Sequence, residues 1–320
     1  MAIRSMLDAP SELKSRVSAQ GIAFSKKRIP SFNFGVGQGQ GDSWEQYPEG
    51  QDVELSIYTP SSSASMAGGQ DGPFPTVVWM HGGAMAMLDP SVSTYRTLGY
   101  LLASMGVLVV FPHFTNSVDA PFPRGLHDCL SAVHWVFHHQ AELGASSQLV
   151  VVGDSGGGNL ALATALLANK IGFDGIRGVY AMCPSIRGVY PAEDCPSHLE
   201  FDNYVLSVTS PLGLLPFKLY TTPLDEDTPS VEESEFTSLM WPSFASAEEL
   251  RSLPPVVISV NELDPLRDEG LAFARRARKA GAHARAVIRV GTTHGGDMSV
   301  GLCDLAHATL ADIAFFVKNT

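Results

Sequence analysis

Short runs of β-branched and other apolar residues recur along the chain, and longer segments with helical apolar spacing separate them. Most of these runs are continuously apolar, which is typical of strands covered on both faces. The expected strands are residues 53–58, 76–80, 107–111, 149–152, 179–182, 256–260 and 286–290. The expected helices are residues 95–104, 125–142, 158–170, 268–280 and 302–317. This alternation predicts an α/β fold, with a mostly parallel central sheet flanked by helices.

Two regions break the alternation. Residues 1–50 include a Gly- and Gln-rich passage, and residues 184–248 are rich in Pro, Ser and acidic groups. Large apolar side chains are interspersed in the second region, so it is too apolar to be a free linker. We expect residues 184–248 to pack as a cap over the carboxyl ends of the strands, where open α/β sheets bind their ligands.

Charge and cysteine content narrow the choice of partners and compartment. With 33 Asp and Glu against 21 Lys and Arg, the net charge is −12. We expect no nucleic-acid or membrane partner, because both attract basic surfaces and no stretch approaches the roughly 20 apolar residues of a membrane span. The four scattered cysteines favour reduced thiols in a cytoplasmic protein without a signal peptide. Only Cys183 and Cys195 could form a bridge if the protein were secreted.

A G-x-S-x-G motif occupies residues 153–157, directly after an expected strand and directly before an expected helix. A serine on such a tight turn needs neighbours without side-chain bulk, and the helix N-terminus faces any oxyanion that forms there. We therefore predict that Ser155 is a nucleophile. The alternative is a Gly-rich turn without catalytic function. A phosphate loop is excluded because no Gly-Lys-Ser/Thr follows.

A second glycine pair, Gly82-Gly83, follows His81 at the end of the expected strand 76–80. Acyl transfer requires two or three backbone N–H donors around the tetrahedral oxygen, and glycines let that backbone approach closely. We predict Gly82, Gly83 and Gly156 as the oxyanion hole, with Ala84 as a further candidate. His81 is expected to organise the loop rather than to transfer protons.

In proteins with this serine turn, the catalytic acid follows the serine along the chain and the catalytic histidine follows the acid. Asp264 lies just after the expected strand 256–260 and before a proline, and His294 lies in a Gly-rich loop after the expected strand 286–290. We predict Asp264 as the acid and His294 as the base. Glu262 and Asp268 remain alternative acids.

Another histidine pair has the i, i+4 spacing of metal ligands on a helix. His134 and His138 are expected on one helix face, but no Glu of an HExxH motif lies between them and no third ligand is evident. We interpret the pair as part of a solvated helix face and predict no metal site.

These motifs together resemble the hormone-sensitive-lipase-like branch of the α/β-hydrolase esterases, the bacterial family IV type. The motifs that carry the resemblance are HGGA at 81–84, GDSGGGN at 153–159, DPLRDE at 264–269 and HG at 294–295. Ala84 replaces the third Gly of the family loop, and Gly156 replaces its usual Ala, but both positions keep their N–H donor.

The resemblance implies an α/β-hydrolase fold with a cap made from two segments. The chain would divide into an N-terminal cap segment (1–50), a core (51–183), a cap insertion (184–248) and the remainder of the core (249–320). The resemblance also implies no metal and no organic cofactor, and an assembly that in this branch is often a homodimer.

The predicted function is a serine carboxylesterase that hydrolyses short- to medium-chain esters or lactones, with a small-molecule ester as its partner. An amidase or peptidase of the same fold is one alternative, although the chain is too short to include a β-propeller. A non-catalytic ligand receptor is another, although such receptors generally lose the base and His294 is present. The sequence also leaves open an acyltransferase that uses an alcohol in place of water.

Overall fold

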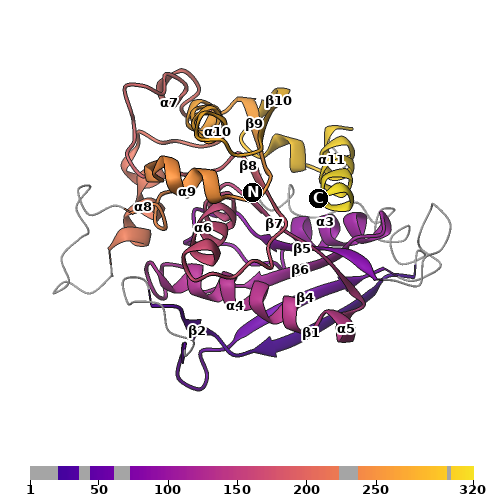
Figure 1. Cartoon of the computed structure of the whole chain (residues 1–320). Coiled ribbons are helices and arrows are strands. Elements are labelled where there is room, and N and C mark those ends of the chain that lie inside the picture. The colour runs from indigo at the N-terminus through magenta and orange to yellow at the C-terminus, as the bar shows by residue number, and fades with distance from the viewer. Residues whose placement is uncertain (1–20, 36–43, 61–72, 223–236, 301–303) are drawn as a thin grey trace.

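The computed structural model describes residues 21–35, 44–60, 73–222, 237–300 and 304–320. An eight-stranded sheet in the order β1-β4-β6-β5-β7-β8-β9-β10 forms its centre (Figure 1). β4 pairs antiparallel with β1 and β6, and all pairs from β6 to β10 are parallel. The strands are β1 (Ala23–Ile29), β4 (Val53–Thr59), β5 (Phe74–Met80), β6 (Leu108–His113), β7 (Ala145–Asp154), β8 (Gly178–Met182), β9 (Val256–Leu263) and β10 (Ala284–Thr293). The predicted fold class is confirmed.

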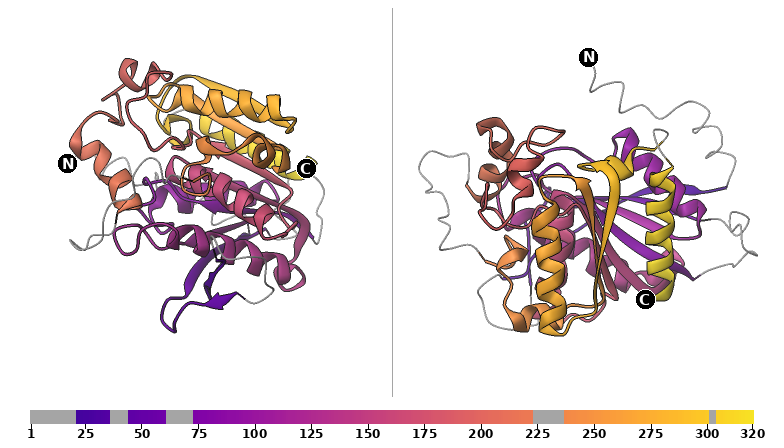
Figure 2. Two further views of the ribbon diagram at one scale, coloured as in Figure 1. Left: turned by 60° about the vertical axis from the view of Figure 1, so that its left-hand side comes forward. Right: turned by 90° about the horizontal axis from the view of Figure 1, so that it is seen from above.

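Helices cover both faces of this sheet, as the views in Figure 2 show. They are α3 (Ser93–Ser104), α4 (Arg124–His138), α5 (Gln140–Leu143), α6 (Gly156–Lys170), α7 (Ser197–Glu200), α8 (Pro211–Thr221), α9 (Ala247–Ser252), α10 (Arg267–Ala280) and α11 (Leu305–Asn319). Two short 3-10 helices are η2 (Pro242–Phe244) and η3 (Gly296–Met298). Within the described residues, none of the helices has the length and apolar character that crossing a membrane would require.

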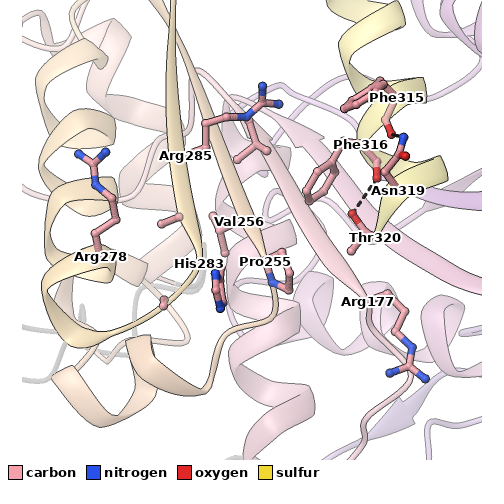
Figure 3. A pocket seen from close by; sticks show the side chains of 13 residues that line it. Arg177, Pro255, Val256, Arg278, His283, Arg285, Phe315, Phe316, Asn319 and Thr320 are labelled. Atoms are coloured by element: carbon pink, nitrogen blue, oxygen red, sulfur yellow. Dashed lines mark hydrogen bonds between the residues drawn. The ribbon is translucent and has the colours of Figure 1, made fainter.

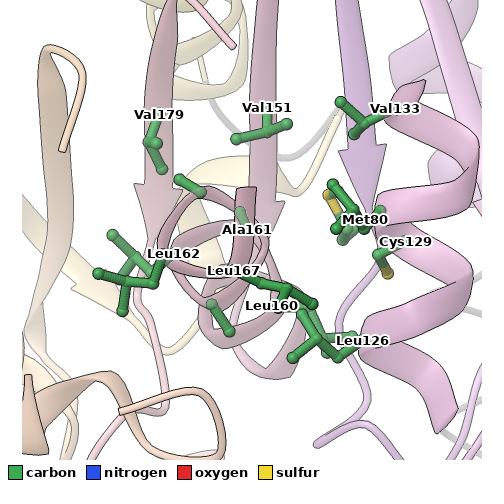
Figure 4. Close-up of a cluster of buried hydrophobic side chains, with 14 of the residues drawn as sticks. Met80, Leu126, Cys129, Val133, Val151, Leu160, Ala161, Leu162, Leu167 and Val179 are labelled. Atoms are coloured by element: carbon green, nitrogen blue, oxygen red, sulfur yellow. The ribbon is translucent and has the colours of Figure 1, made fainter. Parts of the chain in front are cut away.

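Two buried apolar layers attach the helices to the sheet. One face packs against α4, α6 and α10, and Figure 4 shows Leu126, Leu160 and neighbouring side chains between the first two helices and the strands. The other face packs against α3 and α11 through residues such as Leu98 and Ile313. The strands between the two edge strands β1 and β10 are mostly buried from both sides, which explains why most of them have continuously apolar sequences.

One sheet strand lies in the segment that the resemblance assigned to the cap. β1 is exposed at six of its seven positions and carries three consecutive cations, so it has no apolar run that a sequence pattern could detect. Such charges protect an edge strand from pairing with another chain. β2 (Phe32–Asn33) and β3 (Glu45–Gln46) add a two-stranded ribbon. Residues 1–20 and 36–43 of this segment lie outside the described part.

Residues 186–198 of the insertion lie against the amino end of α10. The Ser197 hydroxyl donates to the Pro265 carbonyl over 2.7 Å, and the Ser197 backbone N–H donates to the Asp268 carboxylate over 2.9 Å. The buried Glu269 carboxylate accepts hydrogen bonds from the Ile186 N–H and from the Tyr190 hydroxyl, and it lies 3.0 Å from His198 Nε2. These contacts hold the insertion against the loop that follows β9. Residues 223–236 of the predicted cap insertion lie outside the described part.

Candidate active site

Ser155 lies on a sharp turn between β7 and α6. Its backbone has φ 54° and ψ −119°, a region that residues other than glycine rarely occupy and that costs roughly 1–3 kcal/mol. Its neighbours must be glycines, because a Cβ on Gly153 would clash with the Gly157 carbonyl and a Cβ on Gly157 would clash with the Met80 carbonyl. The turn therefore stores strain in order to present the serine hydroxyl at the carboxyl end of the sheet.

Three predicted residues meet at this turn. His294 Nε2 lies 3.0 Å from Ser155 Oγ, and His294 Nδ1 lies 2.8 Å from Asp264 Oδ2. They come from the loops that follow β7, β9 and β10, which end at the same edge of the sheet. Asp264 is fully buried and its Oδ1 accepts the Leu266 N–H over 2.9 Å, which fixes the orientation of the carboxylate.

The electrostatics of the histidine follow from this geometry. Burial alone would lower the pKa of His294, but the Asp264 carboxylate beside it raises the pKa well above its ordinary value of 6.5. A carboxylate in this position also selects the ring form with the proton on Nδ1, which leaves Nε2 free to accept a proton from Ser155.

Asn261, a residue that the sequence analysis did not identify, holds the histidine loop. Its Oδ1 accepts the Gly295 N–H over 3.0 Å, and its Nδ2 donates to Thr292 Oγ1 and to Asp297 Oδ1 over 2.7 and 2.8 Å. The sequence offered one signal for this role, a polar residue directly after the apolar run 256–260. A polar side chain buried at such a position must have hydrogen-bond partners.

The alternative acids are engaged elsewhere. Glu262 Oε2 accepts the Gly291 N–H over 2.7 Å, and Asp268 accepts from Ser197 and from Arg267 at the first turn of α10. Both groups stabilise loops around the site. Of the three carboxylates considered, the structure places Asp264 on His294.

The glycine loop after β5 only partly matches the expected oxyanion hole. The Gly82 N–H donates to Tyr95 Oη over 2.7 Å inside the protein, so the expectation that Gly82 is an oxyanion donor is not supported. Gly156 packs tightly on the next part of the loop, since a Cβ there would lie 2.7 Å from Ala84 Cα and 2.6 Å from the Met85 nitrogen. The loop segment beside the serine is therefore the one that begins at Gly83.

A buried network connects this loop to the serine turn. Tyr95 Oη donates to Asp154 Oδ2 over 2.8 Å, and Trp79 Nε1 donates to Asp154 Oδ1 over 2.9 Å. Burial raises the pKa of Asp154 to about 6 in spite of these hydrogen bonds. Because Asp154 directly precedes Ser155, the network fixes the distance between the serine and the glycine loop. Tyr95 was not recognised from the sequence, since no local motif links a helix residue to the loop.

A second chain of serine, histidine and aspartate lies near the same loop. Ser56 Oγ is 2.8 Å from His113 Nε2, and His113 Nδ1 is 2.8 Å from Asp89 Oδ2. Ser56 is only 2 % exposed in the middle of β4, so no substrate can reach it. The two serine–histidine–aspartate series have similar hydrogen-bond distances. They differ in the serine, because Ser56 is buried in a strand and Ser155 lies on a strained turn.

The histidine pair on α4 forms a two-residue contact. His134 Nε2 and His138 Nε2 lie 3.0 Å apart, and burial together with the neighbouring His138 lowers the pKa of His134 to about 4. In the described part of the chain, no third His, Cys, Asp or Glu joins them. The predicted site residues that converge are therefore those around Ser155.

A hollow lies at the opposite edge of the sheet. Its volume is about 890 Å³, and its lining includes Arg177, His283 and Arg285, which precede or begin β8 and β10 (Figure 3). Ligands of open α/β sheets bind at the carboxyl ends of the strands, and this hollow lies at their amino ends. It contains none of the predicted site residues.

The chain is similar to known hydrolases in sequence and in structure. A model of the family described as "alpha/beta hydrolase fold" matches residues 77–298. Esterase Est22 is 33 % identical and superimposes with a TM-score of 0.83, over 100 % of this chain and 88 % of that chain. Brefeldin A esterase, described as a bacterial homologue of human hormone sensitive lipase, is 34 % identical with a TM-score of 0.78, over 97 % of this chain and 86 % of that chain.

Two curated proteins show similarity in sequence. Lipase 2 of Moraxella sp. (strain TA144) is 29 % identical, over 85 % of this chain and 66 % of that protein. Carboxylesterase NlhH of Mycobacterium tuberculosis is 28 % identical, over 65 % of this chain and 61 % of that protein. The matched region thus spans slightly less than two thirds of the length of either relative.

Proposed function

Because the chain belongs to the alpha/beta hydrolase fold family, in its hormone-sensitive-lipase-like branch, we propose that it is a serine carboxylesterase with Ser155 as its nucleophile. The observation that carries this proposal is the hydrogen-bonded chain from Ser155 through His294 to Asp264, which starts on a strained turn. An exposed hydroxyl beside a base that is itself oriented by a carboxylate is the arrangement that nucleophilic acyl transfer requires.

The reaction proceeds in two steps. His294 Nε2 takes the proton from Ser155 Oγ as the oxygen attacks the ester carbonyl, and the same proton then passes to the departing alkoxide. The acyl group remains on Ser155. Water then gives a proton to His294 and attacks the acyl carbon, which releases the acid and restores the serine. Asp264 stabilises the imidazolium in both steps.

The oxyanion is held by backbone N–H groups of Gly83, Ala84 and Gly156. The Gly156 N–H lies at the first position of α6, where the helix N-terminus favours negative charge. Ala84 replaces Gly82 in the predicted set, because the Gly82 N–H is donated to Tyr95 and because Ala84 packs on Gly156. Gly82 contributes by anchoring the loop in place.

Tyr95→Phe tests this anchoring role. The substitution removes the buried hydroxyl that accepts the Gly82 N–H and donates to Asp154, and each buried hydrogen bond lost in this way costs roughly 1–3 kcal/mol. We expect kcat on p-nitrophenyl butyrate to fall by about tenfold, less than the 10²–10³-fold loss of a direct donor, with little change in KM. Tyr100→Phe on the same helix should leave kcat unchanged. A wild-type kcat for Tyr95→Phe would contradict the role.

The pH profile tests the base. His294 must be neutral in order to accept the serine proton, so kcat/KM rises with pH through the pKa of His294. The Asp264 carboxylate raises that pKa, and the acid limb of the profile should therefore have its midpoint above the ordinary value of 6.5. Initial rates on p-nitrophenyl acetate between pH 5 and 9 measure it. A midpoint below 6.5 would show that the proposed base does not control the rate.

We propose esters or lactones of short to medium acyl length as substrates. Met85 supports this limit, because its buried side chain lies against Gly156, with Sδ 2.7 Å from where a Cβ would be. We expect the rate on p-nitrophenyl esters from acetate to palmitate to fall for acyl groups longer than roughly a dozen carbons, given the usual size of ligand pockets. A rate that continues to increase towards palmitate would contradict the proposed acyl-length preference.

We propose three further properties, which concern the cap, the compartment and the oligomeric state. The cap consists of residues of the first fifty positions other than the sheet strand β1, together with the insertion at 184–248. The protein acts in the cytoplasm, which fits the free thiols of Cys129, Cys183 and Cys195. It forms a homodimer, which fits the exposed apolar side chains of Ile288 and Val290 on the edge strand β10.

A further inference from the structure

One thiol beside Ser155, His294 and Asp264 has no place in the proposed reaction. Cys183 directly follows β8 and has φ 34°, in the left-handed region that side chains other than glycine rarely adopt. Its N–H donates to the Ser259 carbonyl of β9 over 2.7 Å, which holds this conformation. The side chain is 1 % exposed and forms no disulfide. The fold thus places a free thiol at the carboxyl edge of the sheet.

The thiol lies next to two of the proposed catalytic residues. One ligand atom from each of Cys183, Asp264 and His294 lies within 4.8 Å of the other two. The residues follow three adjacent strands, β8, β9 and β10, so the backbone that carries them is rigid. In the described part of the chain, they are the one group of three such side chains whose ligand atoms converge.

Sulfur, carboxylate oxygen and imidazole nitrogen together form a donor set that suits a particular class of metal. Zn²⁺ binds all three, with bonds of about 2.0–2.3 Å, so that two ligands of one tetrahedral ion lie roughly 3.3–3.7 Å apart. His294 Nδ1 and Asp264 Oδ2 lie 2.8 Å apart and would separate slightly, and Cys183 Sγ, which lies within 4.8 Å of both, would move about 1 Å closer to reach these separations. A soft sulfur ligand selects against Mg²⁺ and Ca²⁺, which prefer oxygen alone.

We propose that Cys183, Asp264 and His294 form an inhibitory binding site for a thiophilic divalent cation such as Zn²⁺ or Cd²⁺. On binding, the Cys183 thiol releases its proton to solvent, and the imidazole gives a nitrogen lone pair to the ion. The ion enters from the side on which the ester binds, where the His294 side chain is 14 % exposed.

Binding at this site stops catalysis. The ion takes the Nδ1 lone pair, on the side of Asp264, and the proton of Nδ1 moves to Nε2. Nε2 then donates a hydrogen and cannot accept the Ser155 proton, and bonds to the ion replace the hydrogen bond to Asp264. The inhibition rests on the proposed function, whereas the binding itself does not.

The thiol is suited to metal binding rather than to modification by large reagents. Burial raises the pKa of Cys183, so the group is a neutral thiol in the free protein and a poor nucleophile. A small ion with a strong affinity for sulfur can displace the proton. An alkylating reagent would need both a thiolate and open access, and Cys183 offers neither.

The first test measures inhibition of the full chain by ZnCl₂ in a buffer free of chelators. Rates on p-nitrophenyl acetate are expressed relative to the metal-free rate of each variant. We expect Cys183→Ala to raise the half-inhibitory zinc concentration at least tenfold, and the buried Cys195→Ala to leave it unchanged. A chelator should restore the wild-type rate. Equal zinc sensitivity of the wild type and Cys183→Ala would overturn the proposal.

The second test needs no activity. Titration with CdCl₂ should raise the ultraviolet absorbance of the wild type through a cadmium–thiolate bond, with one ion bound per chain. Cys183→Ala should lack this signal and Cys195→Ala should keep it. If the wild type shows no such absorbance, the metal site is refuted. If the absorbance is present but the protein hydrolyses no ester, the esterase proposal fails and the metal site stands.

Discussion

Replacing Ser155 by alanine is expected to lower kcat on p-nitrophenyl acetate by about 10⁶-fold, the loss found when the serine of a comparable triad is removed. The oxygen of Ser155 forms the bond to the acyl carbon, and no other described hydroxyl lies beside His294 Nε2. Activity that remains would come from the oxyanion donors acting on a water molecule, which contribute about 10³–10⁴-fold over solvent.

The fold should tolerate this change. Alanine has the same Cβ as serine, so the turn at φ 54° carries the same strain in both proteins. Ser146→Ala is a matched control and should keep kcat within about twofold, because this half-buried residue lies at the opposite end of β7 from the site. Thermal unfolding monitored by circular dichroism compares all three proteins. A folded Ser155→Ala variant with more than a tenth of the wild-type kcat would contradict the role of the serine.

Asp264→Asn is expected to lower kcat by about 10⁴-fold while the protein stays folded. Asp264 accepts two different donors, the Leu266 N–H at Oδ1 and the histidine ring at Oδ2. An asparagine has one oxygen, and if that oxygen keeps the Leu266 contact then its NH₂ faces His294. The ring then carries its proton on Nε2 and presents a donor to Ser155 in place of an acceptor.

Glu262→Gln is the matched control for the acid. Glu262 lies two residues before Asp264, and its carboxylate accepts the Gly291 N–H. We expect its kcat to remain within a few fold of wild type. Steady-state rates on p-nitrophenyl acetate at pH 8 compare the two variants. If Glu262→Gln loses more activity than Asp264→Asn, the assignment of the acid is incorrect.

Much of the fold could be predicted from the sequence because most of its strands are covered on both faces. All seven strands expected from continuous apolar runs are present, each within a few residues of its predicted bounds. β1 could not be found in this way, because an exposed edge strand has no apolar run and is specified only by its pairing with β4. The predicted helix 125–142 is divided at His139, where the backbone leaves the helical region before α5.

The candidate site was predictable to the extent that its residues follow strand ends. Ser155, Asp264 and His294 each lie just after an apolar run, and parallel strands bring such positions to one edge. The oxyanion loop was less predictable, since the Gly82 N–H is taken by a hydroxyl on α3 and no local pattern reveals this partner. Asn261 and Cys183 were missed as neighbours of the histidine for the same reason: their roles depend on contacts between strands.

The most direct test of the central claim is covalent capture of the nucleophile. The full chain is treated with diethyl p-nitrophenyl phosphate, a neutral ester whose phosphorus is attacked by an activated serine. The proposed mechanism predicts one p-nitrophenolate released per chain and a diethylphosphoryl group on the peptide that contains Ser155, with neither in Ser155→Ala. A folded wild type that releases no p-nitrophenolate, or a label on another residue such as Ser56, would contradict it.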